Sequence, residues 1–189
     1  MNIEEIFNQR TCYNFADKEI SQGLLKEIYD ITKLGPTSVN SSPLRIIFVS
    51  SKAEKAKLLD CLAHGNIDKT KTAPISAILA YDLEFYKYMD KLFPHNLKMK
   101  KLLESNKDLA YDTAYLNSSL QAAYFMMVAR AKGLASGPMS GFDTDKLNKT
   151  FFDNTSFRVN FICNLGYETK IEEPPRGPRL SFDESCSFI

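Results

Sequence analysis

The spacing of hydrophobic and polar positions changes several times along this chain, and each change predicts a new secondary-structure element. The apolar residues of 24–34 recur at helical spacing; Ser21 before them fits an N-cap, and Gly35 closes the pattern. A shorter helix is expected over 2–9, ending near Arg10. The first part of the chain therefore predicts two helices joined by an irregular or extended connection.

Two later segments, 44–49 and 74–81, are apolar almost without interruption, and the first suits a strand buried on both faces. A helix is expected over 53–62, and His64-Gly65-Asn66 reads as a break after it. Because two strands are joined here through a helix, we expect a parallel or mixed sheet.

The second half of the chain opens with a long helical pattern from Asp108 to Gly133. At 1.5 Å per residue this helix would span roughly 40 Å, enough to cross a domain as its central helix. A short strand is expected over 134–138, then a helix capped by Asp143, then a strand over 157–165. Strands are therefore expected on both sides of the long helix in the sequence.

Two regions have no single interpretation. Residues 82–107 mix aromatic side chains with lysines and acids, and they fit an aromatic flap over a site, a dimer surface or a small helical excursion. Residues 168–189 contain Pro174, Pro175 and Pro178 and little apolar density, which taken alone describes a loose tail. No internal repeat or interdomain linker divides the 189 residues, so we expect one domain, 1–189.

Composition narrows the function classes. The formal charge of +1 does not favour a dedicated nucleic-acid binder, which needs clustered Lys and Arg for its phosphate contacts. The four cysteines are far apart and there are two histidines, so neither a zinc cluster nor a disulfide framework is expected. With acids near the amino terminus and no long apolar run, a cytoplasmic protein is the simplest expectation.

The segment Gly35 to Pro43 is the most distinctive loop. Four hydroxyls and one carboxamide lie between its two prolines, with no charge among them. Such a loop offers many hydrogen-bond donors and acceptors on a backbone that the prolines stiffen, which suits a flat, neutral, polar ligand, although loops are rich in these residue types in any case.

Several cations lie in loop-like sequence and could meet at one phosphate, although each could equally be a solvated surface charge. They are Arg10, Lys69, Arg176 and Arg179. Neither the Gly-x-Gly-x-x-Gly pattern of dinucleotide-binding folds nor the phosphate-binding loop of nucleotide triphosphatases is present. No pair of acids stands out as a catalytic acid and base.

With these residues in view, the chain resembles the flavin-dependent nitroreductase superfamily over nearly its whole length, and within it the malonic semialdehyde reductase group. The most specific part of the signal is the pair of loops Leu34 to Pro43 and Gly137 to Asp143, about a hundred residues apart. Shorter motifs agree with them: Arg10-Thr11, Gly65-Asn66-x-x-Lys69-Thr70, Ala73-Pro74, Phe93-Pro94-His95, Asn164-x-Gly166-Tyr167 and Pro178-Arg179-Leu180.

The resemblance implies an α+β fold with a mixed central sheet flanked by helices. It also implies an intertwined homodimer that binds FMN in two clefts at its interface, with NADH or NADPH as cosubstrate. It further implies that the tail, 168–189, embraces the partner. Flavin-binding residues follow from the motif positions: Arg10, Thr11, Lys69 and Arg179 at the phosphate and ribityl chain; Asn66 beside the flavin; Ser38, Asn40 and Ser41 at the ring, some from the partner; Ser140 and Gly141 near the flavin N5; and Pro36, Pro138 and Met139 as further cofactor-binding residues.

The residues agree with that cofactor, because a dianionic phosphate needs several cations and a flat uncharged ring needs a polar loop. A protein of this kind binds, orients and tunes a cofactor that carries the redox chemistry itself. One departure stands out: the family often begins with Arg-Arg-Ser-x-Arg, where this chain has Gln9-Arg10-Thr11-Cys12-Tyr13. Two basic positions are absent, and we hypothesise that Arg176 compensates.

The leading functional hypothesis is an FMN-dependent NAD(P)H oxidoreductase of ping-pong type. Its acceptor would be a nitroaromatic, a quinone or a short aldehyde such as malonic semialdehyde. The alternative is a non-catalytic protein that stores FMN or acts as a regulator, to which the departures at Gln9 and Tyr13 lend some support. Reductive dehalogenation is a third possibility, and a nucleic-acid role is the least favoured.

Overall fold

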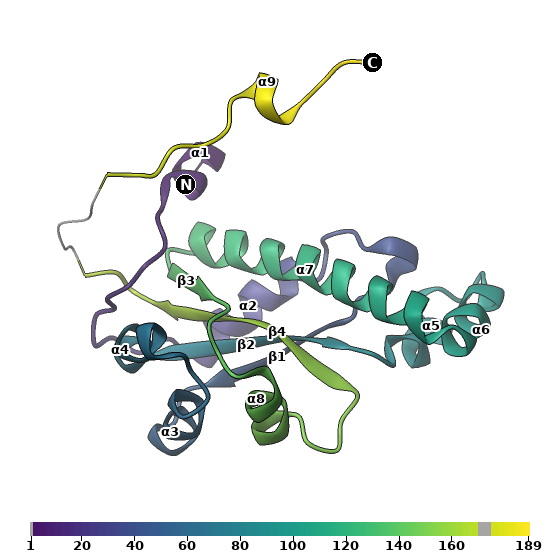
Figure 1. The fold of residues 1–189 in the computed structure, drawn as a ribbon, viewed down its shortest axis with the longest axis horizontal. Coiled ribbons are helices and arrows are strands. Elements are labelled where there is room, and N and C mark those ends of the chain that lie inside the picture. Colours follow the sequence, from purple (N-terminus) through teal and green to yellow (C-terminus); the bar gives the residue numbers. More distant parts are fainter. Residues whose placement is uncertain (1, 170–174) are drawn as a thin grey trace.

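A four-stranded sheet is the centre of the fold in the computed structural model, which describes residues 2–169 and 175–189 (Figure 1). The strand order is β1-β2-β4-β3, so β1 and β3 form the two edges. The strands are β1 (Leu44–Val49), β2 (Ile75–Asp82), β3 (Ala135–Met139) and β4 (Phe157–Gly166).

Every described strand pair is antiparallel, so the α+β class is confirmed and the parallel or mixed pairing is wrong. The reason lies between β1 and β2, where α3 (Lys52–Leu59) and α4 (His64–Thr72) form the connection. Val49 pairs with Ser76, so the chain leaves β1 and enters β2 at the same end of the sheet. The helices therefore reverse the chain direction without a crossover along the sheet.

The predicted break at His64-Gly65-Asn66 is also wrong, because these residues begin α4, with Ala63 as the N-cap residue. Weak helix formers are tolerated in a first turn whose amides have no helical partner. The expectation that the first strand is buried on both faces is wrong as well: β1 is an edge strand and its four central residues are half-buried.

Helices cover both faces of the sheet. On one face lie α2 (Gln22–Thr32) and α7 (Lys107–Ala131), and on the other lie α3, α4 and α8 (Thr144–Phe151) (Figure 1). Alternate residues of β2 serve the two layers: Leu79 packs with Phe125 of α7, while Ile78 packs with Leu58 and Leu147. This two-sided burial places β2 in the middle of the core.

Several predicted boundaries are confirmed by their caps. The Ser21 side chain accepts a hydrogen bond from the Leu24 amide at 3.2 Å, and Asp143 accepts from the Lys146 amide at 2.9 Å. The amino-terminal helix α1 (Ile3–Asn8) begins with a capping box formed by Asn2 and Glu5. Local side-chain chemistry, readable in the sequence, therefore sets where these helices start.

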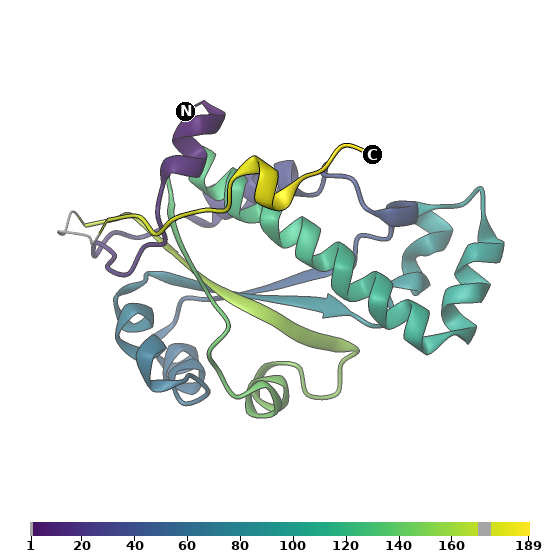
Figure 2. The same cartoon turned by 45° about the horizontal axis from the view of Figure 1, so that its top comes forward.

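Residues 82–107 form short helical pieces with a small core of their own. They are η2 (Phe85–Tyr88), α5 (Met89–Leu92) and α6 (Leu97–Ser105). Phe85, Met89 and Leu103 are buried against Tyr81 and the first turns of α7. In Figures 1 and 2 this part of the chain projects beyond the end of the sheet beside the start of α7.

The central helix α7 is confirmed, and its 25 residues present two different faces. One face packs on the sheet, whereas the other leaves a row of apolar residues exposed or half-exposed at spacings of three, four and seven. We call this row the α7 stripe; it consists of Leu109, Leu116, Leu120, Ala123 and Met127.

The C-terminal segment packs little against the rest of the chain. Residues 175–189 are all exposed, including the short helix α9 (Phe182–Ser185), and in Figure 1 this segment runs past α1 and away from the sheet. Pro174, which the sequence assigned to the tail, lies outside the described residues. Within residues 2–169 and 175–189, no helix is both long and apolar enough to cross a bilayer.

A glycine fixes how the segment after α1 lies on β3. The Cys12 amide donates to the Ser136 carbonyl at 2.9 Å, and a Cβ at Gly137 would lie 2.6 Å from the Cys12 carbonyl oxygen. We expect Gly137→Ala to lower the free energy of unfolding by about 1 to 3 kcal/mol, because backbone would have to move. Urea denaturation measures the change. Gly65→Ala is the control: nothing lies within 4 Å of a Cβ there, so no loss is expected, and an equal loss in both variants would contradict the assignment.

Candidate functional site

A cavity of about 480 Å³ at the carboxyl end of α7 gathers four arginines. They come from three separate parts of the chain: Arg10 follows α1, Arg130 lies on α7, and Arg176 and Arg179 lie in the C-terminal segment. Among the described residues that line it, none is an acid. The cavity is therefore strongly electropositive and suits a multiply charged anion.

Arg130 ties the walls of this cavity together. Its Nε donates to Ser136 Oγ at 2.8 Å, and its Nη1 donates to the Gln9 carbonyl at 3.1 Å and to the Ile6 carbonyl at 3.3 Å. Burial lowers the pKa of Arg130, and the nearby positive charge of Arg176 lowers it further. One buried side chain thus holds the end of α1, the Gln9–Cys12 segment and β3 in a fixed relation.

The C-terminal arginines are more exposed. The Nη2 of Arg176 donates to the Asn8 carbonyl at 2.7 Å, so this side chain satisfies part of the carboxyl end of α1. The Nη1 of Arg179 donates to the Gly177 carbonyl at 3.0 Å. Both guanidinium groups reach the cavity from the segment 175–189.

Lys69 and Asn66 of α4 extend the site beyond the cavity. The Lys69 Nζ lies 5.2 Å from the ring centroid of Tyr13, a cavity residue, and partial burial lowers the pKa of Lys69. Asn66 Nδ2 donates to the Gly141 carbonyl at 2.7 Å. A Cβ at Gly141 would lie 2.6 Å from Asn66 Nδ2, so a larger residue there would displace the Asn66 side chain from this position.

A buried polar chain anchors α4 to the sheet. Ser76 Oγ donates to Asn164 Oδ1 at 2.7 Å, and Asn164 Nδ2 donates to Thr70 Oγ1 at 3.0 Å. Thr70 Oγ1 in turn donates to the Asn66 carbonyl at 2.8 Å. Because all three side chains are fully buried and bonded, they fix the turn of α4 that carries Asn66 and Lys69.

The polar loop Gly35 to Pro43 lies elsewhere. The Ser38 amide donates to Asn117 Oδ1 at 2.7 Å, and Asn40 Nδ2 donates to the Leu92 carbonyl at 2.8 Å. Asn117 is thirteen residues before Arg130 on α7, which is about 20 Å along a helix. The loop also precedes the edge strand β1, whereas Ser140 and Gly141 follow the opposite edge strand, β3.

The loop has an unusual backbone. Val39, Asn40 and Ser42 have φ values of 50°, 51° and 42°, in the left-handed region that is particularly costly for a β-branched residue such as Val39. Ser41 is fully buried, and its Oγ has no hydrogen-bond partner among the described residues. The loop is therefore held in a strained shape by the structure around it.

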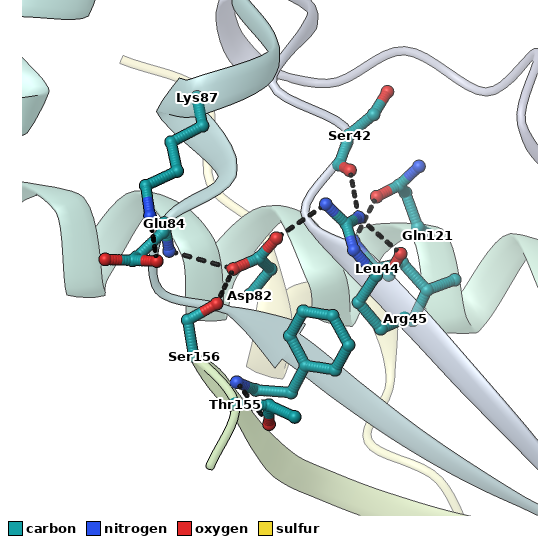
Figure 3. A network of polar contacts seen from close by, with 10 residues as sticks. Ser42, Leu44, Arg45, Asp82, Glu84, Lys87, Gln121, Thr155 and Ser156 are labelled. Atoms are coloured by element: carbon teal, nitrogen blue, oxygen red, sulfur yellow. Dashed lines mark hydrogen bonds and ion pairs between the residues drawn. The ribbon is translucent and has the colours of Figure 1, made fainter. Parts of the chain in front are cut away.

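Figure 3 shows one of the networks that hold it. Arg45 Nη1 donates to the Ser42 carbonyl at 3.0 Å, and Arg45 Nη2 pairs with Asp82 Oδ2 at 2.6 Å. Asp82 is 2% exposed, and its Oδ1 accepts from Ser156 Oγ at 2.7 Å and from the Glu84 amide at 2.9 Å. The network joins β1, β2 and the start of β4 to the end of the loop.

The structure thus brings some predicted site residues together and separates others. Arg10, Thr11, Arg176 and Arg179 line one cavity, and Lys69, Asn66, Ser140 and Gly141 lie on the elements next to it. Pro138 is half-buried in β3 and Met139 is buried there. On one chain, Ser38 is bonded to Asn117 in the middle of α7 and Asn40 to the Leu92 carbonyl. The Pro36 carbonyl lies nearer to the cavity, because it accepts from Tyr124 Oη, one turn before the cavity residue Met127. Ser41, in the same loop, is buried.

Arg130 was not among the predicted site residues. The sequence does contain a signal for it, because Arg130 is the single charged residue in the apolar run Ala122 to Ala131. A charged side chain in such a run is expected to be buried with partners and not solvated. The sequence also did not reveal the residues that position the polar loop, which are Asn117, Arg45 and Asp82. They belong to no motif, and they lie far from the loop in sequence or on the strands that follow it.

Comparison with known proteins gives a consistent result. The nitroreductase family model matches residues 6–167. A protein of Polynucleobacter asymbioticus, named as a candidate NADH dehydrogenase/NAD(P)H nitroreductase, is 47% identical over 189 residues, covering 100% of this chain and 96% of its own.

Two solved structures have the same fold. A candidate nitroreductase of Bacillus subtilis aligns with a TM-score of 0.89 at 21% identity, covering 98% of this chain and 97% of its own. A candidate nitroreductase of Exiguobacterium sibiricum, solved in complex with FMN, aligns with a TM-score of 0.88 at 20% identity, covering 100% of this chain and 97% of its own.

Asp82→Asn tests the network behind the polar loop. We expect it to lower the free energy of unfolding by about 3 kcal/mol, because it leaves the Arg45 guanidinium without its buried partner charge. Chemical denaturation measures the loss. Lys87→Ala is the matched control, since it removes the exposed Lys87–Glu84 pair and should cost less than about 1 kcal/mol. Similar losses in the two variants would rule out a special role for Asp82.

Proposed function

Because the chain belongs to the nitroreductase family, we propose that it is an FMN-dependent NAD(P)H oxidoreductase that reduces a small acceptor. The observation that carries the proposal is the arginine-lined cavity at the end of α7, beside Lys69 and the Asn66–Gly141 contact. A dianionic phosphate attached to a flat, neutral ring would use both parts of this site.

The residues present fit FMN. Arg10, Thr11, Arg176 and Arg179 would hold the phosphate and the ribityl chain, with Lys69 close by. We assign Pro138, Met139, Ser140 and Gly141 to the flavin ring, together with Asn66. The Gly141 carbonyl accepts from both Asn66 Nδ2 and the Ala63 amide, so this loop is rigid before any ligand binds.

When bound, FMN would supply the redox chemistry by accepting hydride from a nicotinamide and giving it to the acceptor. The protein's own contribution is to bind and orient. Hydride transfer through a flavin does not require a catalytic acid and base from the protein, so we infer that the last proton comes from water. The nicotinamide and the acceptor would then use one position in turn, which is a ping-pong mechanism.

We further propose that the site is completed by a second copy of the chain. Asn117, which holds Ser38 of the polar loop, is about 20 Å along α7 from Arg130 in the cavity, and the α7 stripe is apolar, exposed or half-exposed, and continues to Met127 at the cavity wall. A partner packed on the stripe could bring its Pro36, Ser38 and Asn40 to the flavin ring. The exposed segment 175–189, with Leu180 and Phe182, would cover the partner.

We also propose which chemical classes the electron acceptor belongs to. A nitroaromatic, a quinone or a short aldehyde such as malonic semialdehyde would each fit a reductase of this family, and the motif resemblance favours the aldehyde. Steady-state rates with one member of each class, at equal NADH, rank them. A dehalogenated product from a haloaromatic acceptor would instead favour reductive dehalogenation.

The enzyme function predicts a simple spectral result. Purified protein reconstituted with FMN should lose the visible absorption band of oxidised flavin when NADH or NADPH is added without oxygen, and should regain it when an acceptor follows. A bound flavin that stays oxidised with both nicotinamides would overturn the enzyme function and favour a storage or regulatory role. Protein that takes up no FMN would overturn the cofactor assignment itself.

The dimer predicts a second result. Leu116→Glu should convert a dimer to a monomer and greatly weaken FMN binding, because it places a charge in the middle of the apolar stripe. Size-exclusion chromatography with light scattering and the flavin content per chain measure both effects. Thr144→Glu, at an exposed position of α8 on the other face of the sheet, also replaces a neutral side chain with a carboxylate and is the charge-matched control. A wild-type monomer that binds FMN fully would contradict the proposal.

A further inference from the structure

We propose that Arg130 of α7 binds the flavin phosphate directly, as the cation that takes the place of the basic residue absent at Gln9. The proposal rests on the proposed FMN-dependent function. It assigns to the phosphate site a residue from the middle of the fold that no motif of the sequence contains.

The geometry of the guanidinium carries the proposal. Arg130 is 8% exposed, and two of its three nitrogens are already committed: Nε to Ser136 Oγ, and Nη1 to the carbonyls of Gln9 and Ile6. Its Nη2 makes no hydrogen bond with any described residue, and Arg130 lines the arginine cavity. A planar group clamped through two nitrogens offers the third in a fixed direction.

The charge balance points the same way. Arg130 is partnered by hydroxyl and carbonyl oxygens and, in the described part of the chain, by no carboxylate. A buried cation without a counter-ion is costly, and the positive charge of Arg176 close by adds to the cost. A phosphate dianion in the cavity would neutralise both charges.

Arg130 is better placed for this role than Arg176, the residue we first expected to compensate for Gln9. Arg176 is exposed and its Nη2 is committed to the carbonyl of Asn8. Arg130 is buried, and its hydrogen bond to the Gln9 carbonyl places it next to the position where the family motif carries a basic side chain. Arg130 thus contacts the backbone of Gln9, the residue whose missing positive charge it would supply.

A purely structural clamp is the competing explanation, and riboflavin separates the two. Riboflavin has the same ring and ribityl chain as FMN but no phosphate. Loss of a phosphate contact weakens FMN alone, whereas loss of a clamp that shapes the site weakens both ligands. The experiment titrates the full-length apoprotein with each flavin, for wild type, Arg130→Gln, Arg130→Lys and Lys132→Gln.

We expect Arg130→Gln to weaken FMN binding by about tenfold to a hundredfold, the worth of a charge-assisted hydrogen bond, and to change riboflavin binding by less than about twofold. Arg130→Lys, which keeps the charge without the fork, should fall between. Lys132→Gln, two residues further on and paired with Glu27, should leave both affinities unchanged. The salt dependence of FMN binding should also become shallower in Arg130→Gln.

Equal weakening of FMN and riboflavin, or no weakening of FMN, would overturn the role of Arg130. If Arg130→Gln does not fold, Arg130→Lys decides by the same comparison of the two flavins. If riboflavin binds too weakly to measure, an unchanged salt dependence of FMN binding overturns the role. Wild-type protein that binds neither flavin would instead show that the proposed function has failed.

Discussion

The rigid length of α7 is the constraint on which the rest of this structure depends. One end of the helix carries Arg130 into a cavity that lacks any described acid, and its middle carries Asn117, which holds the polar loop. A helix cannot shorten, so Asn117 and Arg130 stay about 20 Å apart along it on one chain. The apolar stripe between them is what a second chain would need in order to bring them together.

The cavity and the polar loop differ in their charge and in their backbone conformation. At the cavity, like charges are gathered on elements that hydrogen bonds through Ser136 and Gln9 hold in place, and the described lining residues include no acid. The polar loop has no charged residue and its backbone is strained, and the ion pair of Arg45 and Asp82 supports it from β1 and β2. The first arrangement gives affinity through electrostatics, and the second gives shape.

Local signals in the sequence were enough for most elements. Ser21 and Asp143 cap helices as expected, and the length of α7 follows from its apolar spacing. Sheet direction was not predictable in this way, because whether the helices between β1 and β2 reverse the chain or cross over depends on tertiary packing. The family motifs named Arg10 and Lys69, but Arg130 was missed, since a single charge in an apolar run does not show which groups its side chain contacts.

The left-handed residues of the polar loop have a consequence for how this protein could be re-engineered. Val39 and its neighbours adopt a shape that their own sequence does not favour, and the contacts that impose it come from α7, from β1 and from the carbonyl of Leu92. A transplant of residues 35–43 into another scaffold would leave those contacts behind. The loop would then relax, and the unit that can be exchanged between relatives is the loop together with its distant supports.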